Sequence, residues 1–144
     1  MEWERNNYTV SCDAERLDLS VIRNFLTESY WAKGIPIDVV AKSIRHSLNF
    51  GLFDVNQQIG YARVVSDYAT FAYLGDVFVV AEYRGSGLGK WLMQCVVKHP
   101  DLQSMRRWLL ATKDAHELYR QFGFTELKNP NVLMEIHDPD IYGA

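Results

Sequence analysis

Hydrophobic and polar positions follow two periods along the chain, and each change of period marks a boundary between elements. Alternating or continuous runs of β-branched and aromatic residues are typical of strands. Such runs predict six strands, at residues 8–12, 50–55, 59–65, 70–80, 107–112 and 132–136. Apolar pairs that recur one turn later predict four helices, at residues 18–31, 36–48, 87–98 and 114–123. The predicted order is β-α-α-β-β-β-α-β-α-β, which defines a mixed α/β (α+β) fold.

Residues that favour helix ends agree with these boundaries. Asp18 has the side chain of an N-cap, and Pro36 suits the first turn of the second helix. Asp114 and Glu117 have the spacing of a capping box at the start of the last helix, and Gly123 can adopt the left-handed conformation that ends it.

The composition is that of an ordinary globular protein. The 144 residues are 48% hydrophobic and 23% charged, with a net charge of −3 and no run of like charges, which argues against nucleic acid and anionic membranes as partners. Cys12 and Cys95 form no metal or redox motif, and the amino terminus does not have the pattern of a signal peptide, so we expect a cytoplasmic protein. No apolar run reaches the ~18 residues of a membrane span. We predict one domain over residues 1–144, with a loose tail at about 138–144.

The stretch from Asp76 to Lys90 carries the strongest chemical signal. An apolar strand leads into a turn with glycines at three alternate positions, and a helix follows. Glycines in this arrangement leave successive backbone N–H groups uncovered at the positive end of a helix dipole, which favours a phosphate or pyrophosphate. Arg84 and Lys90 add positive charge on either side.

Spacing excludes two common phosphate loops. A Walker loop requires a glycine where this chain has Arg84, and a dinucleotide loop requires a glycine where it has Lys90. The pattern that remains is Arg84-x-x-Gly87-x-Gly89 after a hydrophobic strand. By itself it is also compatible with a tight turn that binds no ligand.

With this pattern the chain resembles the GNAT superfamily of acetyl-CoA-dependent N-acetyltransferases, whose signature is Q/R-x-x-G-x-G/A. A second family motif, A-x-x-L/F-Y-x-x-x-G-F, is matched by residues 115–124, Ala-His-Glu-Leu-Tyr-Arg-Gln-Phe-Gly-Phe. The predicted order of elements is similar to the GNAT fold along nearly the whole chain. The resemblance implies a single N-acetyltransferase domain that uses acetyl-CoA as cosubstrate and needs no metal.

The resemblance also implies which residues hold the cosubstrate. The strand residues Phe78, Val79 and Val80 would pair their backbone with the pantetheine arm, and a bulge in this strand would separate it from the strand near Trp108. Many members have an asparagine where this chain has Thr112, so that family contact is not carried over. The pyrophosphate would be held by the loop residues Arg84, Gly85, Ser86, Gly87, Leu88, Gly89 and Lys90, with the Leu88 side chain in the core.

For catalysis the resemblance indicates Tyr119 as the acid that protonates the departing thiolate. Asp76 is an acid inside an apolar strand; it is a candidate to bind or deprotonate the amine, or else a carboxylate bonded to a neighbouring loop. Cys95 lies on an apolar helix stripe, which indicates core packing rather than nucleophilic catalysis. His116 is expected to be a solvated residue in the first turn of its helix.

The acceptor site is predicted from aromatic residues. Tyr30, Trp31 and Tyr73, together with Asp76, are candidates to bind an amine, although Tyr30 and Trp31 could equally pack as a helix end under the sheet. We expect a small-molecule amine as substrate, and a homodimer is compatible with the sequence. The alternative function is a non-catalytic acetyl-CoA sensor. A nucleotide- or nucleic-acid-binding adaptor is disfavoured because the loop motifs do not match and the charge is acidic.

Overall fold

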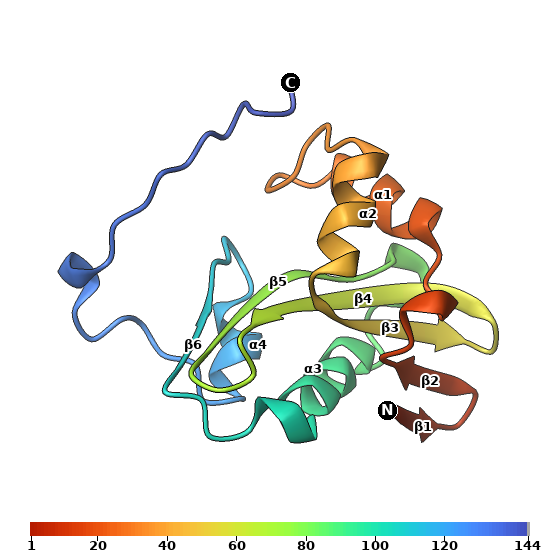
Figure 1. The fold of residues 1–144 in the computed structure, drawn as a ribbon. Helices are drawn as coiled ribbons and strands as arrows, with labels where there is room; N and C mark the ends of the chain where they lie inside the picture. Colours follow the sequence, from red (N-terminus) through yellow and green to blue (C-terminus); the bar gives the residue numbers. More distant parts are fainter. Residues whose placement is uncertain (144) are drawn as a thin grey trace.

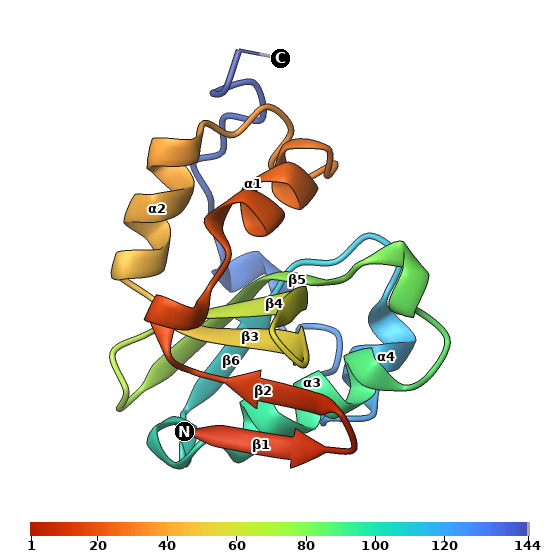
Figure 2. The same cartoon turned by 90° about the vertical axis from the view of Figure 1, so that its right-hand side faces the viewer.

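A six-stranded sheet forms the centre of the molecule and carries two helices on each face (Figures 1 and 2). The structure is a computed structural model and describes residues 1–143. The strands lie in sequence order, antiparallel except for the last pair, β5 and β6. They are β1 (Glu2–Arg5), β2 (Tyr8–Ser11), β3 (Leu48–Asp54), β4 (Gln57–Ser66), β5 (Phe71–Val79) and β6 (Arg107–Leu110). The predicted fold class, a mixed and mostly antiparallel sheet with flanking helices, is confirmed.

The helices enclose two hydrophobic cores. α1 (Leu19–Thr27) and α2 (Ile37–Arg45) cover one face, and α3 (Leu88–Lys98) and α4 (His116–Arg120) cover the other (Figure 2). The first core lies between the sheet and α3 and α4, and the second lies between the sheet and α1 and α2. Within residues 1–143, no helix has the length and apolar character to cross a bilayer.

Several helix boundaries follow the predicted chemistry. The Asp18 carboxylate accepts hydrogen bonds from the N–H groups of Ser20 and Val21, as expected of an N-cap. The capping box at the last helix is wrong: α4 begins after Ala115 without a side-chain cap, and the Ala115 N–H donates to Thr112 Oγ1 at 3.1 Å. Thr112 thus makes the local turn bond that was expected of Asp114.

The first strand, β1, was not predicted. Glu2–Arg5 is three-quarters charged, so it shows no apolar alternation, yet it pairs with β2 through a turn in which Asn6 adopts a φ of 56°. Asparagine tolerates this left-handed conformation, which closes the hairpin. The observed order therefore begins with two strands rather than one.

The predicted last strand is wrong in this structure. Pro130–Val132 forms a 3-10 turn, and residues 133–138 are extended and have no strand partner in the part of the chain that the structure describes. The chain arches away from the body of the molecule and returns toward α1 and α2 (Figure 1). Met134 and Ile136 are fully exposed, at 98% and 105% of their reference areas. The expected loose tail has no helix or strand at residues 138–143, although Tyr142 packs against the second core; residue 144 lies outside the described residues.

Candidate functional site

A β-bulge in β5 creates the space around which the site is built. Asp76 and Val77 together oppose Ala62 of β4, and Asp76 adopts a φ of 55°. On its other side β5 pairs with β6 only over Phe71–Leu74. Beyond the bulge the two parallel strands diverge, so the last part of β5 has a sheet neighbour on one side only. This is the opening that the family resemblance implied.

The glycine loop follows this free stretch of strand. Gly85 and Gly87 have φ values of 89° and 82°, in the left-handed region, and a Cβ on either would meet nothing within 4 Å. α3 has no side-chain N-cap, and within residues 1–143 no group accepts a hydrogen bond from the N–H groups of residues 85–90. Six consecutive free donors at the positive end of a helix make a cradle that fits a pyrophosphate.

Arg84 crosses from the loop to the end of β5. Its Nε donates to the Val79 carbonyl oxygen at 2.8 Å, and its guanidinium carbon lies 6.0 Å from the centre of the Phe25 ring. The Val80 N–H donates to the Ile59 carbonyl at 2.8 Å. The Val80 N–H is therefore already bonded within the sheet, whereas the Val79 carbonyl oxygen can accept a second hydrogen bond beside that from Arg84.

The Phe78 side chain is a core residue. It is 4% exposed and stacks on Phe25 with 4.0 Å between ring centres. Only the Phe78 backbone is left for a ligand, so any cosubstrate contact there is a main-chain contact. Lys90 and Ser86 are exposed on the loop, and the Leu88 side chain is buried as expected.

Tyr119 lies in the first core at the edge of the opening. Its ring meets Phe124 edge-on at 6.0 Å, and it is 8% exposed. Burial, with smaller contributions from Tyr30 and Asp114, raises the pKa of Tyr119 to about 12. The phenol therefore keeps its proton throughout the neutral range. Within residues 1–143 its hydroxyl makes no hydrogen bond, so it is available to a ligand.

Tyr30 closes the opening from the α1–α2 loop. Its hydroxyl accepts a hydrogen bond from the Lys113 N–H at 3.0 Å, and Lys113 Nζ lies 5.5 Å from the centre of the Tyr30 ring. These contacts join the α1–α2 loop to the segment after β6. Segments 83 residues apart in sequence thus meet beside Tyr119.

Asp76 is held from two sides. Trp31 Nε1 donates to Oδ1 at 2.9 Å, and Arg63 Nε donates to Oδ2 at 2.8 Å. Arg63 also donates to Ser47 Oγ at 3.1 Å. Both carboxylate oxygens are therefore engaged, which gives Asp76 the geometry of a residue that positions Trp31. A role as general base stays a prediction.

Three side chains important to this arrangement were missed from the sequence. Arg63 is a charge inside an apolar strand, which is the same signal that identified Asp76. Lys113 carries no sequence signal, because its contact depends on the path of a distant loop. Glu28 lines a hollow of about 580 Å³ together with Phe25, Ser29, Tyr30 and Trp31.

The remaining candidates lie apart from this cluster. Tyr73 lies upstream of the bulge, where β5 is paired on both sides, and its ring packs beside Gly75. Cys95 is buried in the first core, and burial raises the pKa of its thiol to about 12, so it lacks the reactivity of a nucleophile. His116 is exposed at the start of α4.

Comparison with known proteins agrees with this geometry. Residues 46–126 match the family model described as an acetyltransferase (GNAT) domain. A Gibberella zeae protein named as an acetyltransferase is 31% identical over 140 residues, which cover 81% of this chain and 78% of that protein. A Clostridium acetobutylicum acetyltransferase, solved with acetyl-CoA, shares the fold at 16% identity, with a TM-score of 0.63 over 91% of this chain and 95% of that one.

The crystal structure of a GNAT-family acetyltransferase from Xanthomonas campestris is 51% identical and superposes with a TM-score of 0.93. The superposition covers 97% of that chain and 95% of this one; the other 5% of 144 residues is about seven residues. Since the segment from residue 127 to residue 143 is longer than that, the superposition includes most of it.

Proposed function

Because the chain belongs to the GNAT acetyltransferase family and is an acyltransferase, we propose that it transfers the acetyl group of acetyl-CoA to the primary amine of a small molecule. The transfer would occur by direct attack of the neutral amine in a ternary complex, without a covalent enzyme intermediate. The free thiols of Cys12 and Cys95 are in keeping with the cytoplasm as its location.

One observation carries the proposal: six free N–H groups follow the part of β5 that no longer pairs with β6. The N–H groups of residues 85–90 provide donors for a pyrophosphate, and the diverging strands β5 and β6 leave room for an extended arm. In this proposal the Tyr119 hydroxyl would supply a hydrogen-bond donor to the departing sulfur.

Tyr119 is proposed to donate to this sulfur. A pKa of about 12 keeps the phenol protonated, but it also makes full proton transfer to a thiolate of ordinary pKa, ~8.5, unfavourable. We therefore expect Tyr119 to act chiefly as a hydrogen-bond donor that stabilises the charge developing on sulfur.

The acceptor is proposed to bind in the hollow beside Tyr30 and Trp31. Aromatic faces attract ammonium groups, and the Glu28 carboxylate adds a negative charge to the same hollow. Asp76 would hold Trp31 in place there. This combination favours a cationic primary amine over an anionic or neutral acceptor.

A panel of primary amines incubated with acetyl-CoA, monitored by release of free thiol, tests the proposal. We expect diamines or amino sugars to react and a basic peptide to react poorly. The Glu28→Gln variant should raise KM for the active amine with little effect on acetyl-CoA binding, whereas Glu15→Gln, an exposed carboxylate on a different segment, should change neither. Binding of acetyl-CoA without amine-dependent thiol release would instead favour a sensor, and acetylation of the peptide alone would favour a protein substrate.

A further inference from the structure

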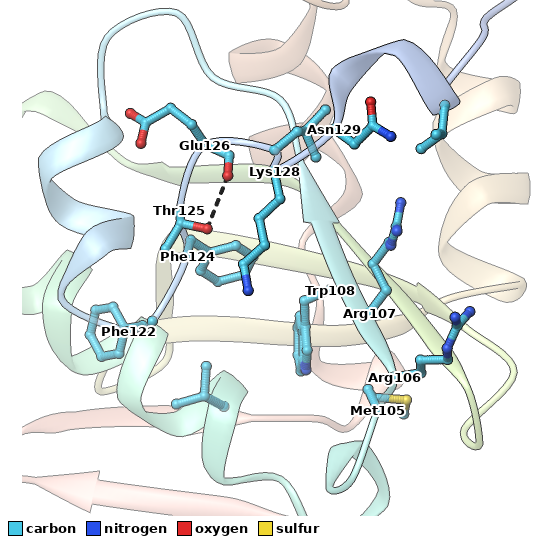
Figure 3. A pocket seen from close by; sticks show the side chains of 14 residues that line it. Met105, Arg106, Arg107, Trp108, Phe122, Phe124, Thr125, Glu126, Lys128 and Asn129 are labelled. Carbon is cyan, nitrogen blue, oxygen red and sulfur yellow. Dashed lines mark hydrogen bonds between the residues drawn. The ribbon is translucent and has the colours of Figure 1, made fainter.

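The free edge of the sheet at β6 borders a hollow, lined by both aromatic and charged side chains, that lies outside the proposed acyl-transfer site. The hollow has a volume of about 540 Å³ and lies between β6 and residues 122–129 (Figure 3). Trp108 and Phe124 face into it, with Lys128 beside them. Among residues 1–143, β6 pairs only with β5, so its other edge presents backbone groups with no strand partner next to this hollow. Such an edge is a ready template for another strand.

A segment of the same chain has the character of the strand this edge lacks. We call residues 133–138 the C-terminal arm. Met134 and Ile136 alternate with Glu135, and both apolar side chains are fully exposed. Exposed β-forming residues with period-two alternation are not stable as an isolated extended segment in water, because their apolar surface and their backbone groups both lack partners.

The charges of the arm and of the edge are opposite. Arg106 and Arg107 lie at the start of β6, and Lys128 lines the hollow, whereas the arm carries Glu135 and Asp138. Within residues 1–143 none of these five side chains forms an ion pair. A strand formed by the arm at the edge of β6 could therefore gain both apolar burial and charge pairing.

The path of the C-terminal arm favours pairing with the β6 edge of another molecule over pairing with its own β6. Val132 contributes to the lining of the hollow, and Tyr142 lies against Gly34 of the α1–α2 loop, so the arm is attached at both ends. Between these points it arches clear of its own sheet (Figure 1).

We propose that two copies of this chain form a symmetric dimer in which the C-terminal arm of each adds a strand to the β6 edge of the other. Met134 and Ile136 would enter the partner's hollow beside Trp108, and the exchange would be reciprocal, as two-fold symmetry requires. The predicted strand at 132–136 would then form between chains. This proposal does not depend on the acceptor or on the chemistry at Tyr119.

Mass in solution is the first test, by light scattering after size exclusion and by analytical ultracentrifugation. We expect twice the 16.7 kDa of one chain. Met134→Asp and Ile136→Asp should each raise the dimer Kd by about a hundredfold or more, since each change occurs twice in the dimer. Both side chains lack contacts within one chain, so circular dichroism should show an unchanged fold.

Val55→Asp, the same type of change at a 62% exposed position in the β3–β4 turn, is the matched control and should remain dimeric. A wild-type mass of one chain overturns the proposal.

Cross-linking separates exchange from a return of the arm onto its own sheet. Double variants pair Arg107→Cys with Leu133→Cys or with Glu135→Cys, because these arm residues alternate with Met134 and Ile136 and would lie on the same face of the sheet as Arg107. The variants are oxidised and run on a non-reducing gel. Exchange predicts a covalent dimer from at least one pair, while the single variants and the wild type, with its native Cys12 and Cys95, stay as single chains. A disulfide formed only within one chain, or a dimer that survives both Asp substitutions, overturns it.

Discussion

Two pairs of glycines serve opposite purposes in this molecule. Gly51 and Gly60 lie in the central strands, where a Cβ would come within 2.7 Å of the Phe53 ring and within 2.8 Å of the Phe78 carbonyl oxygen. Gly85 and Gly87 lie in the loop before α3, where a Cβ would meet nothing within 4 Å. The first pair is required because neighbouring atoms already occupy the space. The second pair keeps the left-handed backbone and an empty space in front of it.

The contrast extends to the regions around them. In the central sheet Tyr61 is fully buried and its hydroxyl donates to Asn49, so polar groups there are paired inside the protein. At the end of β5 the strand loses a neighbour, and the following N–H groups have no partner within residues 1–143. These donors lie on an exposed loop at the N-terminus of a helix, where an anionic ligand can replace water as their partner.

The largest effect should come from Gly87→Glu in the open region. Glu at this position puts a carboxylate in front of the free donors and adds left-handed strain, so we expect acetyl-CoA affinity to fall by about a hundredfold or more, or ~3 kcal/mol. Calorimetric titration measures it. Gly87→Ala carries the strain without the charge and should lose much less. Unchanged affinity in the Glu variant would remove the distinction between the two glycine pairs.

Tyr119→Phe should have the next largest effect. The phenyl ring keeps the packing against Phe124 but cannot donate to sulfur, so turnover should fall roughly ten- to a thousand-fold while acetyl-CoA affinity changes little. Thiol release under saturating acetyl-CoA measures it. Tyr8→Phe makes the same change in β2, away from the opening, and should leave turnover as in the wild type. Full activity in Tyr119→Phe would assign protonation of the thiolate to water or to the substrate.

Gly60→Ala tests the closed region by stability instead of activity. The added methyl meets the Phe78 backbone and Leu52, so unfolding should become easier by about 1–3 kcal/mol, the usual cost of overpacking. Chemical denaturation measures it. Gly89→Ala, whose Cβ has its nearest neighbour at 3.9 Å, should change stability by less than about 0.5 kcal/mol. Equal losses in the two variants would contradict the assignment of tight and open space.

Asp76→Asn should have the smallest effect. Asparagine tolerates the positive φ, but its NH₂ group cannot accept the hydrogen bond from Arg63 or Trp31 that it displaces. A positioning role predicts a few-fold rise in KM for the amine, with kcat and its pH profile little changed. A displaced pH profile for kcat would identify Asp76 as the general base. Asp67→Asn, in the β4–β5 turn, is a control away from Trp31.

Most of the fold could be predicted from the sequence, because most helices and strands have a hydrophobic pattern within their own residues that identifies them. β4, β5 and α3 appeared close to their observed bounds, since their apolar periods and flanking glycines agree. β1 was missed because its sequence, Glu-Trp-Glu-Arg, has no apolar alternation, and its strand conformation depends on pairing with β2. Residues 132–136 have a strand pattern, but within residues 1–143 they pair with no strand, although β6 leaves one edge free. Strand pairing depends on two segments, whereas a hydrophobic pattern describes only one of them.

The part of the candidate site whose residues are adjacent in sequence could be predicted. The loop from Arg84 to Lys90 is local chemistry and lies where it was expected. The network of Asp76, Arg63 and Trp31 joins three separate segments, and only Asp76 signalled itself as an acid in an apolar run. Glu28 is only two residues from Tyr30 in the sequence, but it has no sequence feature that distinguishes it from other surface acids; its place in the hollow is seen only in the structure.

The bulge at Asp76 also changes which residues of β5 face which core. Before it, the even-numbered residues Ala72 and Leu74 face the first core; after it, the odd-numbered Val77 and Val79 do, and Phe78 turns to the second core. The one extra residue shifts the count by one, so inside and outside exchange partway along a single strand. The length of this strand is therefore as constrained as its composition. Removing Asp76 would leave Leu74 and Val77 facing the first core in simple alternation, but it would also remove the bulge at which β5 and β6 separate.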